Sequence, residues 1–161
     1  MIYLDSNVFI YAALGGDKEG NWCRDLIRRV TQGEDEAVTS ALAVDEVVYQ
    51  VRVGRGLDAS TQAGEAVLQM AHLTVAPADT EILWKSLDLG RRLELYPRDA
   101  IHAATALLQG TSELISEDKD FDGVKLPTKS VELTDGKKMA EVSEFTYKFL
   151  SRVDDNQFTR P

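Results

Sequence analysis

The chain contains little cysteine, histidine or proline, and it has no long apolar run. Of its 161 residues, one is cysteine, two are histidine and four are proline. The single cysteine, Cys23, excludes an intramolecular disulfide and a thiolate zinc site, so we expect it to be small apolar filler on a helix. No stretch approaches the roughly 20 apolar residues that span a bilayer, so no membrane association is expected.

The N-terminus also lacks a feature, the basic region of a signal peptide. Its apolar residues are interrupted by Asp5. We therefore interpret this segment as the first strand and helix of a cytoplasmic protein. The sequence contains no internal repeat, low-complexity tract or linker rich in proline or glycine, and its length suits one domain.

Acidic residues outnumber basic ones, 27 to 18, and the net charge is −9. Because affinity for phosphate comes mainly from lysine and arginine, this balance argues against a general nucleic-acid-binding protein. It does not exclude a nucleic-acid enzyme, since metal ions in an acidic site make the local field positive. The arginines fall into groups within residues 24–29, 52–55 and 91–98, which fit either solvated helix faces or a binding surface.

Short apolar segments alternate with helical patterns along the chain. The predicted strands are residues 2–4, 37–39, 73–76, 114–115 and 130–133. The first predicted helix starts directly after Asp5. Further helices are predicted at residues 19–32, 41–53, 58–71, 79–92, 97–108 and 137–152. Such alternation implies βα units, so we expect a three-layer α/β/α sandwich with a central parallel sheet of four to five short strands. One domain would cover residues 1–153, followed by a polar, frayed tail at 154–161.

Acidic residues follow two of the predicted strands. Asp5 comes directly after the first strand, and Asp118 and Asp120 come after the fourth. In an open parallel sheet, ligands bind in the crevice beyond the carboxyl ends of the strands. The pattern therefore places these carboxylates where a binding site is expected.

Asp99 lies in the first turn of a predicted helix, where the helix dipole favours an anion. Simple stabilisation of the helix end and a functional role explain it equally well. His102 follows on the same face and could be a ligand or a general base, although a packed residue beside the site is the favoured interpretation. The small residues Ala103 and Ala106 would let this helix lie close to the sheet.

Glu46 lies on a helix with one apolar stripe, formed by Ala41, Val44, Val48 and Val51. On a helical wheel it falls opposite that stripe, among Leu42, Tyr49 and Val53, which predicts a helix covered on two sides. A carboxylate in such surroundings needs a partner, because burying an unpaired charge is costly. An arginine is the simpler partner, and a metal ion is the alternative.

Four segments carry the most specific signal: MIYLDSNVFI, TSALAVDEV, YPRDAIHAATAL and LISEDKDF. In order and spacing they resemble the PIN domain family, and the chain is similar to the short single-domain toxins of type II toxin–antitoxin operons. The resemblance runs from Met1 to about Leu133. Asp-Ser-Asn at a strand end is common, whereas the third and fourth segments in succession are specific.

The resemblance implies a catalytic set of Asp5, Glu46, Asp99 and Asp118. Asp5, Asp99 and Asp118 would contact a divalent metal directly or through water, and Glu46 would orient the attacking water or bind a second ion. Asp120 would either assist them or only cap its loop. Polar residues of the family pattern around the acids fall on Ser6, Asn7 and Ser116, and less closely on Ser40.

The implied chemistry accounts for these residue types. In-line cleavage of a phosphodiester requires a nucleophilic water and stabilisation of charge, and Mg²⁺ or Mn²⁺ held by carboxylates supplies both. Without a cation, four gathered acids would repel one another and raise their pKa values. The resemblance further implies an RNA substrate, a homodimer and a cognate antitoxin that places a basic side chain in the acidic site. Arg52 and Arg55 are the candidate contacts to RNA.

Other functions remain open at this point. The same fold could serve as a non-catalytic RNA- or protein-binding module, or as a housekeeping RNA-processing nuclease. A phosphatase or receiver-like enzyme could use Asp5 as a phosphoryl acceptor, but Asn7 stands where the haloacid-type phosphatases have a second aspartate. The apolar helix segments 22–30 and 44–53 are candidate partner surfaces, although each is more simply explained as core.

Overall fold

A computed structural model of the chain describes residues 1–124 and 128–129. The strands in this part are β1 (Ile2–Leu4), β2 (Ala37–Ser40), β3 (Leu73–Ala76), β4 (Leu114–Ile115) and β5 (Thr128–Lys129). The helices are α1 (Ser6–Leu14), α2 (Lys18–Thr31), α3 (Ala41–Arg55), α4 (Leu57–Leu68), α5 (Thr80–Leu93), α6 (Pro97–Leu108) and the short 3₁₀ helix η1 (Lys119–Gly123). None of the helices in the described residues combines the length and apolar character needed to cross a bilayer.

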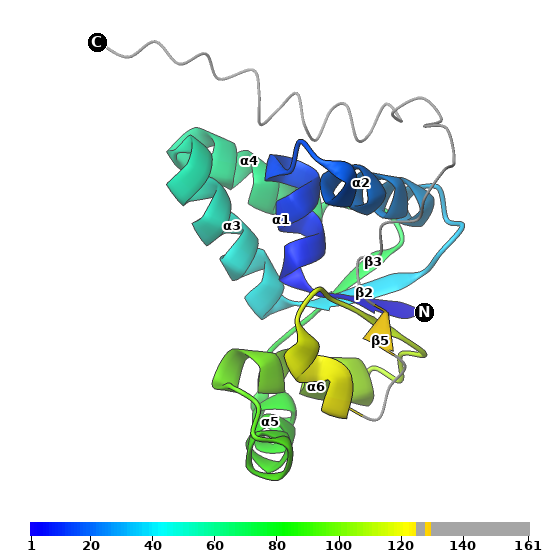
Figure 1. Ribbon diagram of the computed structural model, residues 1–161, viewed down its shortest axis with the longest axis vertical. Coiled ribbons are helices and arrows are strands. Elements are labelled where there is room, and N and C mark those ends of the chain that lie inside the picture. Colours follow the sequence, from blue (N-terminus) through cyan, green and yellow to red (C-terminus); the bar gives the residue numbers. More distant parts are fainter. Residues whose placement is uncertain (125–127, 130–161) are drawn as a thin grey trace.

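The strands form one parallel sheet in the order β3-β2-β1-β4-β5. Helices α1 to α4 cover one face of the sheet, and α5 and α6 cover the other (Figure 1). This is the predicted three-layer α/β/α sandwich with a short-stranded parallel sheet, so the prediction of fold class is confirmed.

The two faces of the sheet carry separate cores, because successive residues of a strand point to opposite sides. Leu4 and Ile115 pack in the core beneath α1 to α4. Their neighbours Tyr3 and Leu114 pack in the core beneath α5 and α6. Cys23 of α2 belongs to the first core and is fully buried, as predicted for an apolar filler.

The order of the strands reverses between β1 and β4, which is the position where ligands bind in open α/β sheets. The chain moves from β1 to β2 and β3 on one side, and then to β4 and β5 on the other. The backbone N–H of Asp5 donates to the carbonyl of Ile115 at 3.1 Å, which joins the two strand ends. Asp5 and Ser116, the first residues after β1 and β4, therefore lie side by side.

Helix α3 differs from the prediction in the direction of its buried face. Its buried residues are Ala43, Val47 and Val51, whereas Ala41 is exposed. Tyr49 and Val53 are 60% and 71% exposed, so the helix is not covered on the side that carries them. The reason is the choice of neighbours: α3 packs mainly against α4 and α1, so the side facing these helices is buried and the side carrying Tyr49 and Val53 faces solvent.

Most other predicted boundaries lie within three residues of those observed. The Ser40 hydroxyl accepts from the backbone N–H of Ala43 and caps α3, as predicted. The fifth strand occupies Thr128–Lys129, before the predicted position at 130–133. The predicted strand at 130–133, the helix at 137–152 and the tail at 154–161 lie outside the described residues.

Candidate active site

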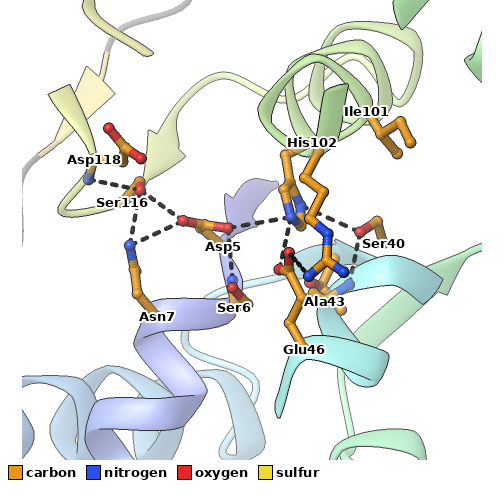
Figure 2. A network of polar contacts seen from close by, with 12 residues as sticks. Asp5, Ser6, Asn7, Ser40, Ala43, Glu46, Ile101, His102, Ser116 and Asp118 are labelled. Carbon is orange, nitrogen blue, oxygen red and sulfur yellow. Dashed lines mark hydrogen bonds and ion pairs between the residues drawn. The ribbon is translucent and has the colours of Figure 1, made fainter. Parts of the chain in front are cut away.

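Asp5 lies at the N-terminus of α1 and accepts hydrogen bonds at both carboxylate oxygens (Figure 2). Oδ1 accepts from the backbone N–H of Ser6 at 2.7 Å. Oδ2 accepts from the Asn7 amide at 2.9 Å and from the Ser116 hydroxyl at 2.7 Å. The side chain is therefore fixed in one orientation while only 6% of the residue remains exposed.

Ser116 connects Asp5 to the loop that follows β4. Its hydroxyl oxygen accepts from the Asn7 amide at 2.9 Å and from the backbone N–H of Asp118 at 3.0 Å. The segment Ser6-Asn7 on α1 and the segment Ser116-Glu117-Asp118 thus share one network. The structure brings together the polar positions that the sequence predicted, and it shows what each of them contacts.

Glu46 reaches the same crevice from α3 and meets two basic residues of α6. Its Oε2 lies 3.0 Å from Nε2 of His102, and its Oε1 lies 3.3 Å from a guanidinium nitrogen of Arg98. Burial raises the pKa of the Glu46 carboxyl, but the hydrogen bond and charge of His102, with Arg98, lower it below the usual value. Both partners come from α6, and Arg98 is the kind of partner that the sequence favoured for this carboxylate. The predicted cover on the side of Tyr49 and Val53 is wrong, because both residues are exposed.

His102 occupies the space between Asp5 and Glu46. It is 2% exposed, and its Nε2 lies 3.6 Å from Oδ1 of Asp5. On the other side of the ring, Nδ1 lies 2.7 Å from the Tyr3 hydroxyl and 3.3 Å from the Ser40 hydroxyl. Burial lowers the pKa of the imidazole, yet the hydrogen bond to Glu46 and the charges of Asp5, Glu46 and Asp99 raise it above its ordinary value.

Three more acids lie at the entrance of the crevice. Asp99 is in the first turn of α6, Asp118 caps η1, and the Asp118 carboxylate accepts from the backbone N–H of Asp120 at 2.9 Å. One carboxylate oxygen from each lies within 4.8 Å of the others. Burial and the charges of Asp118, Asp5 and Asp120 together raise the pKa of Asp99 to about 6, although the charge of His102 lowers it.

The acids and His102 thus form two adjoining groups of side chains that differ in burial. We call Asp5, Glu46 and His102 the inner group and Asp99, Asp118 and Asp120 the outer group. Asp5 contributes to the raised pKa of Asp99, so the two groups interact electrostatically. The structure therefore gathers all four predicted catalytic acids, together with Asp120, around the ends of β1 and β4.

The outer group fits a divalent cation by its chemistry. It offers three oxygen donors, which suit Mg²⁺ or Mn²⁺ better than softer metals. Among the side chains that the structure describes, no lysine or arginine forms an ion pair with Asp99, Asp118 or Asp120. Among the described residues, the buried Oδ1 of Asn7, which lies beside Asp5, has no hydrogen-bond partner. Uncompensated carboxylates and an unpaired oxygen beside Asp5 both favour a bound cation.

Two residues at the site were missed by the sequence analysis. Arg98, counted there only as part of a basic group, is the arginine that pairs with Glu46. Tyr3 was treated only as an apolar strand residue, whereas its hydroxyl contacts His102. The candidate RNA contacts Arg52 and Arg55 lie in the last turn of α3. A signal for Arg98 existed, because it directly precedes Asp99 in the most specific segment.

Comparison with known protein families identifies the family of this chain. The PIN domain model matches residues 2–126 of the chain. The chain belongs to the PIN domain family. The match includes every residue of the inner and outer groups, so the resemblance inferred from the four segments is confirmed. No protein of curated function matches this PIN chain by sequence.

Solved structures share the fold of this PIN chain at low sequence identity. VapBC2 from Rickettsia felis, bound to a DNA fragment of its promoter, gives a TM-score of 0.64 at 16% identity, covering 81% of this chain and 98% of that one. A toxin–antitoxin complex from Klebsiella pneumoniae gives 0.62 at 20% identity, covering 82% and 98%. VapC20 from Mycobacterium tuberculosis, a sarcin-ricin loop cleaving toxin, gives 0.65 at 15% identity, covering 78% and 96%. At these identities the likeness establishes the fold.

Proposed function

We propose that this PIN protein is a metal-dependent endoribonuclease that hydrolyses RNA phosphodiester bonds and acts as the toxin of a type II toxin–antitoxin pair. One observation carries the proposal: Asp5, Glu46, Asp99 and Asp118, drawn from four separate segments, meet in the crevice at the strand reversal. The family membership and the toxin structures that share the fold support a ribonuclease toxin.

The residues divide the work according to their surroundings. Asp99, Asp118 and Asp5 would hold Mg²⁺ or Mn²⁺, with Asp120 beside them. A cation bound there supplies a nucleophilic water and neutralises charge on the phosphate. Glu46 keeps lone pairs that can accept a hydrogen bond from the attacking water, while His102 and Arg98 fix its carboxylate.

The partners follow from the relatives rather than from the chain alone. Relatives with this fold are described as a complex with an antitoxin and as a toxin that cleaves the sarcin-ricin loop. We infer a structured RNA as substrate, a cognate antitoxin as inhibitor, a homodimer as the assembled form and the cytoplasm as the location. A carboxylate-lined crevice suits an antitoxin segment that carries a basic side chain.

The decisive experiment is RNA cleavage by the purified protein. Wild type is incubated with Mg²⁺ or Mn²⁺ and a panel that includes a sarcin-ricin loop hairpin, transfer RNA and an unstructured strand. We expect metal-dependent cleavage that EDTA abolishes and that the Asp5→Asn variant reduces by a factor on the order of 10² or more.

The matched control is Asp79→Asn. Asp79 caps α5 as Asp5 caps α1, by accepting a backbone N–H, but it belongs to neither group of acids. This variant should cleave at the wild-type rate. Tight RNA binding without cleavage in any metal would instead support a non-catalytic binding module, and identical activity of wild type and Asp5→Asn would refute the assigned site.

A further inference from the structure

We propose that His102 is a positioning residue that holds Asp5 and Glu46 in place, that Tyr3 fixes its ring, and that His102 does not itself bind the metal. The inference deepens the proposed function and rests on it only where catalysis is concerned. Its structural part concerns a buried chain of contacts from β1 through α6 to α3, visible in part in Figure 2.

The contacts of Nε2 determine where its proton lies. Nε2 faces carboxylate oxygens of Glu46 and Asp5, and carboxylate oxygens accept hydrogen bonds. At 3.0 Å from Oε2 of Glu46, Nε2 must therefore carry a proton and donate it. The same nitrogen lies 3.6 Å from Oδ1 of Asp5. One imidazole N–H thus lies between two carboxylates from different segments, which would otherwise repel each other.

A nitrogen that carries a proton cannot coordinate a metal, because its lone pair is no longer available. The other ring nitrogen, Nδ1, is buried against the Tyr3 and Ser40 hydroxyls at 2.7 and 3.3 Å. Neither nitrogen is free for a cation, although the position of His102 beside two acids would suggest a ligand. The hydrogen bond to Glu46 and the close approach to Asp5 assign it to positioning these acids instead.

Tyr3 is placed to prevent the ring from turning. It is fully buried, it lies edge-on to the imidazole with the ring centres 6.0 Å apart, and burial raises the pKa of its hydroxyl well above the ordinary range. The hydroxyl therefore stays protonated and keeps its bond to Nδ1. If the ring flipped, Nδ1 would lose this partner and Glu46 would lose its donor. A tyrosine on the first strand thus acts on a glutamate of α3 through one histidine.

Nuclear magnetic resonance tests the chain of contacts in metal-free protein. The sequence has two histidines, His72 and His102, so the His72→Gln variant assigns both imidazoles. Long-range ¹H–¹⁵N correlations should show His102 protonated at Nε2. In Tyr3→Phe the Nδ1 resonance should move toward that of an imidazole nitrogen without a hydrogen bond. Tyr49→Phe, an exposed change on the same helix as Glu46, should leave both nitrogens unchanged.

Metal binding tests the consequence for the site. Loss of the direct partner of a metal-binding group typically weakens affinity roughly 10- to 100-fold. Tyr3 is one contact further from the metal-holding acids than His102, so we expect the Kd for Mn²⁺ to rise only about threefold in Tyr3→Phe. His102→Asn should show at least this loss, because the shorter amide does not reach Glu46. His102→Gln should recover much of the affinity, since its amide N–H can replace Nε2–H as donor.

Electron spin-echo spectroscopy of the Mn²⁺-loaded protein gives the opposing outcome. Nitrogen coupling to Mn²⁺ that disappears in His102→Gln would show that His102 is a ligand and would overturn the proposal. An unchanged Nδ1 resonance and Mn²⁺ affinity in Tyr3→Phe would overturn the role of Tyr3. If Tyr3→Phe does not fold, the asparagine and glutamine variants decide. None of these measurements uses RNA, so their failure is distinct from absence of ribonuclease activity.

Discussion

The inner and outer groups of the site contain similar residues in opposite surroundings. In the inner group, Asp5 and Glu46 are held by hydrogen bonds and face His102 and Arg98. In the outer group, Asp99, Asp118 and Asp120 face mainly one another, and the pKa of Asp99 is raised to about 6. The protein thus pairs one set of acids with its own hydrogen-bond donors and leaves the other set uncompensated.

This difference indicates how a site of like charges can fold before any metal is bound. Partners within the chain orient the inner carboxylates and compensate part of their charge. The outer carboxylates are more exposed, so water screens part of their repulsion. The inner group is thus preorganised, and in the proposed metal site the outer group would supply most of the drive for binding.

The largest effect is expected from disturbing the inner group by Glu46→Gln. Losing the charge weakens the bonds to His102 and Arg98 and removes the acceptor for water. RNA cleavage should fall by a factor on the order of 10² or more. The free energy of unfolding, measured in urea, should fall by about 1–2 kcal/mol. Asp45→Asn, an exposed change at the adjacent position, should alter neither, and an equal loss in both variants would contradict the assignment.

The second effect concerns the outer group with metal present. At a concentration of Mn²⁺ near 100 times Kd, the folded protein should gain about 2.7 kcal/mol, or several degrees in Tm. Asp118→Asn should remove most of this gain, as measured by thermal denaturation with and without EDTA. Asp122→Asn changes an acid in the same 3₁₀ helix that lies outside the group, so it should keep the gain. A gain that survives Asp118→Asn would place the metal elsewhere.

The third effect concerns the pH dependence of stability in metal-free protein, which the outer group should influence through Asp99. Because the pKa of Asp99 is raised from 3.8 to about 6, a proton on Asp99 stabilises the folded state. That stabilisation is complete below pH 3.8 and is lost as the pH rises through about 6. In EDTA, Asp99→Asn should therefore raise Tm at pH 7.5 by roughly 1–3 °C, after allowance for solvent screening.

The advantage of Asp99→Asn should shrink between pH 6 and pH 4 and vanish below that range. Glu81→Gln, an exposed acid in the first turn of α5, is the control for loss of a charge at a helix start. A rise in Tm that is independent of pH would show that the variant acts through packing rather than through charge.

The smallest effect is expected at the exposed edge of the inner group. The Arg98 side chain is 61% exposed, so its ion pair with Glu46 is screened by solvent. Arg98→Gln should change stability by no more than about 0.5 kcal/mol. Cleavage should fall only a few-fold, as measured by initial rates. Arg92→Gln, which breaks the exposed pair with Asp88, is the matched control, and a large loss in Arg98→Gln would indicate a direct contact with RNA.

Much of the fold could be predicted because its signals are local. Short apolar strands, the Ser40 cap and Pro97 at the start of α6 are all visible in the sequence, and the structure has each of them. The buried face of α3 was predicted wrongly because it depends on the packing of α4 and α1 against this helix. A helical wheel gives the arrangement of residues around an axis, but it does not show which other helices cover them.

The positions of the candidate acids could be predicted from strand ends and family segments, but their interactions could not. No local pattern shows that Glu46 is held by residues 52 and 56 positions away in the chain. The contact between Tyr3 and His102 spans 99 positions and depends on how α6 lies on the sheet. Ion pairs and tautomers depend on tertiary packing, so they could not be predicted from a single sequence.

Strand β1 has three residues, and its end gives the site its first acid. Tyr3 lies in one core, Leu4 in the other, and Asp5 follows beside Ser116 at the candidate active site. A single residue inserted between Tyr3 and Asp5 would either turn Tyr3 toward the other core or displace the acid from the end of β1. A scan of single insertions between Tyr3 and Asp5 should therefore show folding and activity lost together, whereas an insertion before Ile2 should be tolerated.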